Sequence, residues 1–137
     1  MKILKTDKIL IAWIIIVLFL VSWPFPDIQE VTPFDYSDKL VHMILFGVFT
    51  FLLNKSLLSK GLGLKPSSVA AFIGGSAYAG LAEIIQIVAP GRSCSIFDFY
   101  AGAIGSVIAL IIIYIIKARQ GAGDRNDKKG IIQRDRD

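Results

Sequence analysis

The sequence predicts an all-α membrane protein with four transmembrane helices. Of its 137 residues, 54% are hydrophobic, and the mean hydropathy is +0.62. The apolar residues form long runs rather than the alternating or three-to-four-residue stripes of soluble domains. Four such runs, each roughly 15 to 21 residues long, suit a hydrocarbon core about 30 Å thick. We therefore expect a cytoplasmic segment over 1–8, a membrane domain over 9–116 and a basic, disordered cytoplasmic tail over 117–137.

The first expected span is the apolar run Ile9 to Trp23. Pro24 and Pro26 close it, because the residue before a proline disfavours helical geometry. No small-residue pair with the spacing of a cleavage site precedes Trp23, so the run predicts an anchor that stays in the membrane rather than a cleaved signal peptide. The acidic segment 27–38 is rich in turn residues and predicts a short ordered loop.

The second span is expected over residues 40–58. Ser37 or Asp38 would be its N-cap, because both side chains can accept a hydrogen bond from a free amide at a helix start. Lys55 interrupts the apolar run, and its long side chain can reach the membrane surface. A loop rich in lysine and glycine should follow this span.

The third and fourth spans are expected over 69–88 and 96–116, joined by a tight turn at Pro90 and Gly91. Small residues recur at every fourth position in both spans, which favours close helix packing. The stripe in the third span is Ala71, Gly75, Ala79 and Glu83, and that in the fourth is Ala101, Gly105 and Ala109. Glu83 should therefore face protein rather than lipid.

Lysine and arginine predict the orientation. The N-terminal segment, the loop after the second span and the tail are basic, whereas the first connection is acidic and the third carries only Arg92. Basic loops stay on the cytoplasmic side, so both termini should be cytoplasmic and the polar residues of 38–42, 83–86 and 92–98 should meet at the outer face. The tail has no interleaved aromatic residues, so no nucleic-acid partner is expected.

Two pairs of polar residues share helix faces at this outer end. Asp38 and His42 are four residues apart, so the carboxylate could orient the imidazole, or Asp38 could simply cap the helix. Glu83 and Gln86 are three apart, and Glu83 could act as an acid or base or form a structural ion pair with Arg92. Ionisable groups inside a membrane are costly unless they pair or serve a function. The two pairs therefore form a candidate site.

The segment after the third span adds further candidates. Asp98 follows Ser95 at the spacing of a capping box, so it is either a helix cap or a second acid or base. Arg92, with Lys39, would bind an anionic head group, because a guanidinium matches phosphate and carboxylate. Cys94 is the only cysteine, which excludes a disulfide within one chain, and no spacing typical of a zinc or redox site occurs.

The charges favour a joint role for these residues. Three carboxylates face two cations, which leaves one negative charge when the imidazole is neutral. An unpaired carboxylate in apolar surroundings is costly, so a shared proton is expected, as general acid–base catalysis requires. The candidate catalytic residues are Asp38, His42, Glu83 and Asp98, and the candidate substrate-binding residues are Lys39, Gln86 and Arg92. No metal ligand is assigned, although the three carboxylates could hold a magnesium ion together with a substrate phosphate.

Three motifs carry a resemblance to a known family. They are DKLVH at 38–42, EIIQIVAPGRSCSIFD at 83–98 and the glycine at position 105. Over residues 38–116 the chain resembles the VanZ-like family of small bacterial membrane proteins. One position departs from the family pattern, because members often have asparagine where this chain has Gly102.

The resemblance implies a protein of the bacterial cytoplasmic membrane with a polar pocket for lipid head groups. Founding members of the family are linked to teicoplanin resistance. We expect phosphoester cleavage or transfer on a membrane lipid or a lipid-linked cell-wall precursor at the outer leaflet, with no cofactor or oligomeric state assigned. The alternative is a protein that binds or shields a head group without chemistry, which Gly102 favours. A transporter is less favoured, because the chain is short and shows no inverted repeat.

Overall fold

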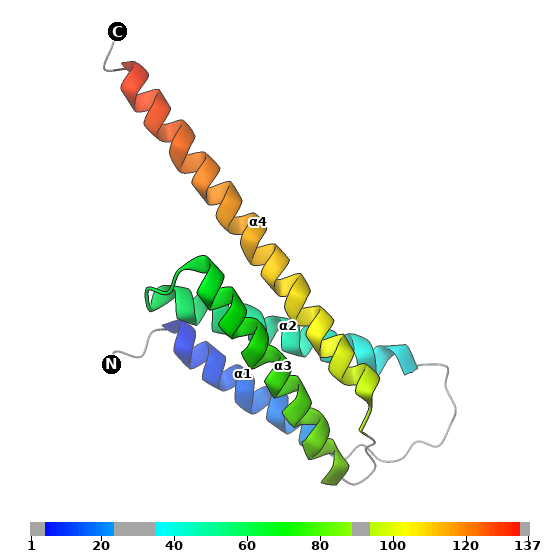
Figure 1. Ribbon diagram of the computed structural model, residues 1–137. Helices are drawn as coiled ribbons and strands as arrows, with labels where there is room; N and C mark the ends of the chain where they lie inside the picture. Colours follow the sequence, from blue (N-terminus) through cyan, green and yellow to red (C-terminus); the bar gives the residue numbers. More distant parts are fainter. Residues whose placement is uncertain (1–4, 24–34, 89–93, 135–137) are drawn as a thin grey trace.

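All regular secondary structure in the computed structural model is α-helical over the residues that it describes, 5–23, 35–88 and 94–134. The helices are α1 (Lys5–Ser22), α2 (Asp35–Ser59), α3 (Leu64–Val88) and α4 (Ile96–Arg134). Figure 1 shows α1, α2, α3 and the first part of α4 packed as a bundle, from which the rest of α4 projects. The all-α prediction is confirmed.

Three helices are long and apolar enough to cross a membrane, namely α2 over Asp38–Ser59, α3 over Leu64–Val88 and α4 over Ile96–Gly123. The shorter α1 is not among them, because its 18 residues include Lys5, Asp7 and Lys8. Large apolar side chains on the outside of the bundle are exposed along every helix, which suits contact with lipid rather than water. The structure thus supports a multi-pass membrane protein with three such helices, one fewer than predicted.

The end of α1 agrees with the prediction from the sequence, but the start of α2 does not. α1 ends at Ser22, just before the prolines that were expected to stop it. The N-cap prediction for α2 is wrong, because α2 begins at Asp35 and places Ser37 and Asp38 inside its first turns. A carboxylate is still favourable there, since the helix dipole is positive at its N-terminus. The predicted loop 27–38 lies mostly outside the described residues, as do the turn at 90–91 and Arg92.

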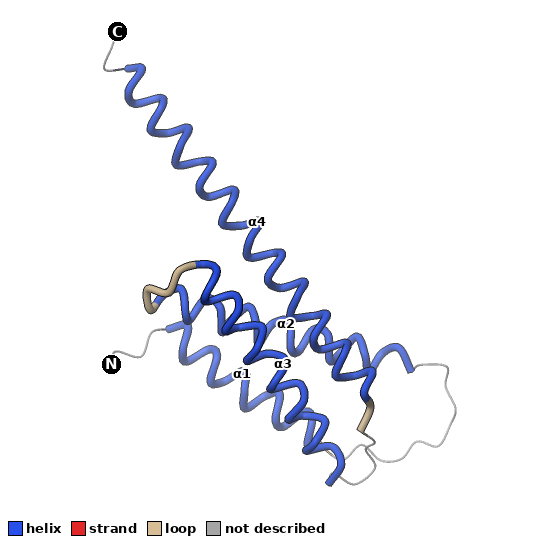
Figure 2. Tube along the Cα trace, viewed as in Figure 1, coloured by secondary structure: helices blue, strands red, loops and turns tan. Residues whose placement is uncertain are grey.

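The last two helices are longer than the apolar runs that predicted them. α3 begins at Leu64 rather than at residue 69, and Pro66 is tolerated in its first turn because amides there have no partner within the helix. Figure 2 shows α4 as an unbroken helix to Arg134, where a disordered tail was expected from residue 117. Lysine, arginine, alanine and glutamine make up ten of the 18 residues in 117–134 and favour helix, whereas the three glycines of this segment do not.

The small-residue stripes pack as predicted. Ala71, Gly75, Ala79 and Glu83 are buried in α3, and Ala101, Gly105 and Ala109 are buried in α4. A Cβ atom on Gly75 would overlap Thr50 Oγ1 of α2 and Ser106 Oγ of α4, and one on Gly105 would overlap the Met43 carbonyl. Thr50 Oγ1 also donates a hydrogen bond to Ser106 Oγ at 2.8 Å. Glycine thus allows the three helices to approach closely.

A tight turn connects α2 to α3. Gly61 has a φ of +91°, a conformation that residues with a side chain rarely adopt. The Gly61 amide donates to the Leu58 carbonyl at 3.1 Å, and the Leu62 amide donates to the Leu57 carbonyl at 3.2 Å. These two bonds form a Schellman motif, which satisfies carbonyls at the end of α2. The two helices therefore run antiparallel with a short, hydrogen-bonded connection.

Polar contacts attach α1 to α2 and α3. Trp13 Nε1 donates to the Leu45 carbonyl at 3.0 Å, and the Tyr78 hydroxyl donates to the Ile14 carbonyl at 2.8 Å. At the end of the bundle near the α2–α3 turn, Asp7 accepts a hydrogen bond from Ser56 and pairs with Lys60 at 3.2 Å. We call this group of three residues, Asp7, Ser56 and Lys60, the turn end.

Candidate functional site

The opposite end of the bundle collects the predicted polar residues. The start of α2, the end of α3 and the start of α4 meet there (Figure 1). The structure brings together Asp38, His42, Glu83, Gln86 and Asp98, which we call the site end. Lys39 is partly buried next to Asp38, whereas Arg92 lies outside the described residues. All members except Asp38 are buried, with at most 5% of each residue exposed.

His42 is the centre of this cluster. Its Nδ1 lies 3.0 Å from the backbone carbonyl of Asp38 and 3.8 Å from the Asp38 carboxylate, so the carbonyl rather than the carboxylate is within hydrogen-bond distance. Its Nε2 lies 3.4 Å from Gln86 Nε2 and 3.5 Å from Glu83 Oε1. With Nδ1–H donating to the carbonyl, the neutral ring presents the lone pair of Nε2 to Gln86. Nε2 thus faces both an amide and a carboxylate of α3.

Glu83 connects the end of α3 to the start of α4. Its Oε2 accepts a hydrogen bond from the Ser95 amide at 2.9 Å, and its Oε1 is buried without a hydrogen-bond partner among the described residues. Glu83 thereby satisfies an amide at the start of α4 that a capping box would have paired with Asp98. The predicted alternative, an ion pair with Arg92, lies outside the described residues.

Asp98 faces inward from the first turn of α4. It is 4% exposed, and its Oδ1 has no hydrogen-bond partner in the described part of the chain. One ligand atom each of Asp98, Asp38 and His42 lies within 4.8 Å of the other two. Buried polar atoms are nearly always paired, so this carboxylate oxygen needs an explanation that the described residues do not supply.

The family asparagine would not fit at Gly102 as the site is packed here. A Cβ atom there would lie 2.9 Å from Phe46 Cδ2 and 3.0 Å from Ala79 Cβ. Phe46 is fully buried, and its ring centroid lies 5.8 Å from that of His42. The aromatic ring therefore occupies the space beside the imidazole that a longer polar side chain on α4 would need.

Phe46 and the buried polar residues that follow it on α2 were not among the predicted site residues. Asn54 is buried, and its Nδ2 donates to Ser68 Oγ at 3.2 Å. A signal was nevertheless present, because the buried residues of α2 recur at every fourth position from the predicted site. This stripe is His42, Phe46, Thr50 and Asn54.

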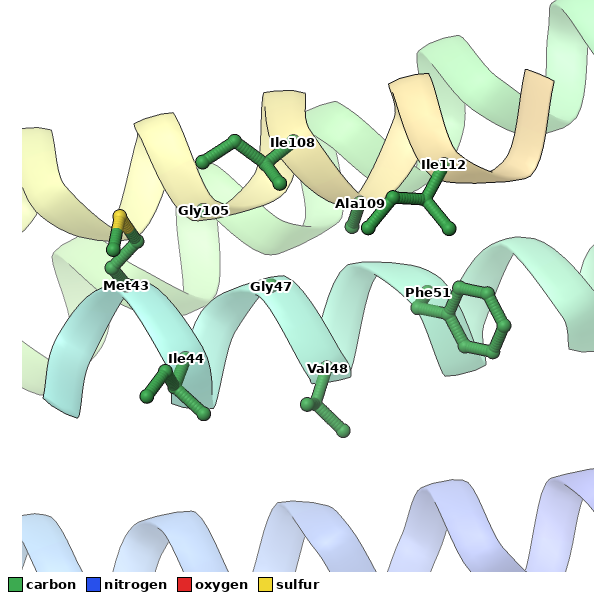
Figure 3. Close-up of a pocket in the computed structure, with 9 residues that line it drawn as sticks. All are labelled: Met43, Ile44, Gly47, Val48, Phe51, Gly105, Ile108, Ala109 and Ile112. Atoms are coloured by element: carbon green, nitrogen blue, oxygen red, sulfur yellow. The ribbon is translucent and has the colours of Figure 1, made fainter. Parts of the chain in front are cut away.

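An apolar groove starts beside the site end. Figure 3 shows it between α2 and α4, and its volume is about 350 Å³. Met43, the neighbour of His42 in sequence, lines one end, and Phe51 and Ile112 line the other. The remaining lining residues are Ile44, Gly47, Val48, Gly105, Ile108 and Ala109. The groove has the chemistry of a surface that contacts hydrocarbon.

Cys94 is exposed and unpaired at the same end. It lines a small hollow of about 290 Å³ between α3 and α4 together with Gly80, Glu83 and Phe99. The buried members of the site end are two carboxylates, an imidazole and an amide.

Comparison with known proteins assigns the chain to a family. No curated protein and no solved structure matches it. Residues 8–117 match the VanZ/LLP1 family, and this range includes α1 from residue 8, all of α2 and α3, α4 to residue 117, and every predicted site residue. The match confirms the VanZ-like resemblance of the motifs. The chain therefore belongs to the VanZ/LLP1 family.

Proposed function

We propose that this protein binds the head group of a membrane lipid or lipid-linked cell-wall precursor at the site end and cleaves or transfers its phosphoester. The observation that carries the proposal is the pair of buried carboxylate oxygens, Glu83 Oε1 and Asp98 Oδ1, that lack hydrogen-bond partners in the described chain near His42. Leaving such groups unpaired costs free energy of folding. Their retention in a membrane bundle supports a role that a ligand completes.

The geometry supports proton transfer between His42 and Glu83. Their facing atoms, Nε2 and Oε1, are 3.5 Å apart, and each side chain is anchored through its other polar atom. The Asp38 carbonyl holds His42 Nδ1, and the Ser95 amide holds Glu83 Oε2. The two atoms need to approach by only a few tenths of an ångström to form the hydrogen bond through which a proton is exchanged. This is the arrangement that a general acid–base pair needs at a phosphoester.

The groove of Figure 3 supports a lipid as the source of the head group. It follows α2 from Met43 to Phe51, a length of about 12 Å at 1.5 Å per residue, and its lining is apolar. An acyl or prenyl chain lying there would place its polar end near His42. The Asp38 side chain is 48% exposed, so the site end also opens to the membrane surface, where a head group would enter.

We further propose that α1 is the fourth span and that both termini lie in the cytoplasm of a bacterial cell. At the turn end, Lys60 of the basic loop pairs with Asp7 of α1, and exposed residues of α1 such as Ile15 and Phe19 suit lipid contact. A periplasmic alkaline phosphatase reporter fused after Asp35 or Ser93 should be active, and one fused after Lys60 or Gln120 should be inactive. Activity at Lys60 would place the site end in the cytoplasm and end the outer-leaflet proposal.

The test of function uses purified full-length protein in nanodiscs with a panel of bacterial phospholipids and lipid-linked precursors. Mass spectrometry should detect a head-group cleavage or transfer product with wild type and at least 100-fold less with Glu83→Gln. Expression in a susceptible host should raise teicoplanin tolerance with wild type but not with this variant. Absence of any lipid product from a well-folded wild-type protein would refute the catalytic proposal.

A non-catalytic head-group-binding protein is the second candidate. The packing of Phe46 against the position that often carries asparagine in the family favours it, because the site then lacks a polar group that other members have. This candidate expects a bound lipid to co-purify unchanged and to dissociate more readily from Glu83→Gln. Turnover of that lipid would exclude it.

A further inference from the structure

The site end has the donor set of a metal site. Asp38 and His42 are one helical turn apart on α2, and Asp98 faces them from α4. Their three ligand atoms lie within 4.8 Å of one another. Ligands that share one ion at about 2.0–2.2 Å are separated by roughly 3–4 Å. A shift of the half-exposed Asp38 side chain would therefore bring the three atoms to ligand distance.

A second observation points to a cation. The Asp98 carboxylate is buried, and its Oδ1 has no hydrogen-bond partner among the described residues. The described groups that act on it electrostatically are two carboxylates, the His42 imidazole and one ammonium, that of Lys39. Counting Asp98 itself, three described carboxylates face one ammonium and one imidazole, so negative charge exceeds positive charge by one even when the imidazole is charged. A divalent ion would offset that excess and supply the missing partner.

The surroundings of His42 fit a metal ligand. A histidine that binds a metal through one nitrogen usually donates its other N–H to a carboxylate, which sets the ring orientation. Nδ1 is the nitrogen beside Asp38, and Nε2 lies 3.5 Å from Glu83 Oε1. The Ser95 amide holds the other oxygen of Glu83 at 2.9 Å. Metal binding at Nδ1 would replace its contact with the Asp38 carbonyl and leave Nε2–H to Glu83.

We propose that Asp38, His42 and Asp98 bind one divalent cation of the Mn²⁺ or Zn²⁺ type. Two carboxylates and one imidazole suit these ions, and three protein ligands leave coordination positions for water or a phosphate oxygen. The exposed side of Asp38 provides the entry path. The proposal that the site binds an ion does not depend on the proposed lipid chemistry. The proposal that the ion polarises a phosphate does rest on that function.

The test titrates Mn²⁺ into metal-free, full-length protein in nanodiscs without substrate and follows free and bound ion by electron paramagnetic resonance. We expect one saturable Mn²⁺ per chain with nitrogen coupling from the imidazole. His42→Gln should remove that coupling, and Asp98→Asn should weaken binding by more than about 100-fold. Glu83→Gln, which acts through His42, should weaken it by about 10- to 100-fold. Asp7→Asn, a carboxylate change at the turn end, should bind as wild type does.

Three results would overturn the proposal: no saturable Mn²⁺ binding to wild type, a Mn²⁺ spectrum without nitrogen coupling, or wild-type affinity in Asp98→Asn. Melting temperatures without Mn²⁺ identify variants that fail to fold. Asp38→Asn, at a half-exposed side chain, gives the same affinity test if Asp98→Asn is unstable. Mn²⁺ binding without any lipid product would refute the proposed function but keep the metal site. Lipid turnover undiminished in metal-free protein would refute the role of the ion.

Discussion

The two ends of the bundle differ in how their carboxylates are paired. At the turn end, Asp7 has both a cation, Lys60 at 3.2 Å, and a hydroxyl donor, Ser56. At the site end, Glu83 and Asp98 each keep one buried carboxylate oxygen without a hydrogen-bond partner in the described chain. The same bundle therefore pairs a carboxylate with a cation and a hydroxyl at the turn end, whereas the described residues leave two carboxylate oxygens without a hydrogen bond at the site end.

Incomplete pairing of a charged group is a better indicator of a functional polar residue than burial alone. Asn54 Oδ1 and Ser76 Oγ are also buried without a partner in the described chain, but neither carries a charge. A buried carboxylate costs more to leave unpaired than an amide or a hydroxyl, because it carries a full charge into a medium of low dielectric. The incomplete pairing of the carboxylates is thus the feature that a ligand would explain. It can be tested by comparing substitutions at the site end with substitutions at the turn end.

The largest expected effect is on turnover at the site end. Glu83→Gln should lower it by about 100- to 10,000-fold, because the general acid or base is lost. The melting temperature should stay near that of wild type, since the new amide oxygen can still accept the Ser95 hydrogen bond. Turnover and melting temperature measured together for Glu83→Gln, Asp98→Asn and the double variant provide the check.

The double variant should lose little more than either single variant, as residues of one catalytic unit do. Losses of turnover that only follow losses of folded protein would make the site end structural, like the turn end.

Packing between the two ends should give the next largest effect. Gly75→Leu should destabilise the bundle by a few kcal/mol, because even the first carbon of the new side chain overlaps Thr50 and Ser106. Gly123→Ala is the matched control, since a Cβ there meets nothing within 4 Å. Thermal melting in detergent should separate the two variants clearly. Equal melting temperatures would mean that α3 does not pack against α2 and α4 through this face.

The turn end should respond in stability rather than in turnover. Asp7→Asn should cost about 1 kcal/mol of unfolding free energy, because Lys60 is 39% exposed and water screens the lost ion pair. Turnover per folded molecule should not change. A large loss of turnover at unchanged stability would show that the two ends are coupled, and would contradict a purely structural role of the turn end.

The smallest expected effect lies between the ends. Thr50→Val removes the hydroxyl that donates to Ser106 while keeping the shape of the side chain. Hydrogen bonds between membrane helices contribute about 0.6 kcal/mol on average, so the melting temperature should fall only slightly. The double variant with Ser106→Ala should lose little more than Thr50→Val alone. A double-variant loss equal to the sum of two large single losses would contradict this.

Much of the fold was predictable because it depends on local pattern. The apolar runs predicted helices in the right order, and the four-residue stripes predicted which faces of α3 and α4 are buried. The start of α3 and the end of α4 were not predicted, because both extend beyond the apolar runs. The first span remains a prediction, since the charges near Lys5 lower the hydropathy of α1.

The gathering of the site residues was also predictable, because antiparallel neighbouring helices bring the start of one next to the end of the other. The pairing of individual atoms was not. Glu83 takes the Ser95 amide that spacing suggested for Asp98, and this choice depends on how closely α3 approaches α4. The packing of Phe46 beside His42 similarly depends on Gly102 of another helix. Their roles in chemistry remain predictions.

The tight turn at Gly61 has a consequence for length variation among relatives. It joins two helices of 25 residues each. The number of residues between His42 and the turn, and between the turn and Glu83, therefore determines whether the two side chains face each other. One residue inserted between His42 and Gly61 would rotate the imidazole by about 100° away from its partner and move it by about 1.5 Å. Insertions and deletions within this hairpin should therefore be far rarer in functional homologues than in the connections on either side of it.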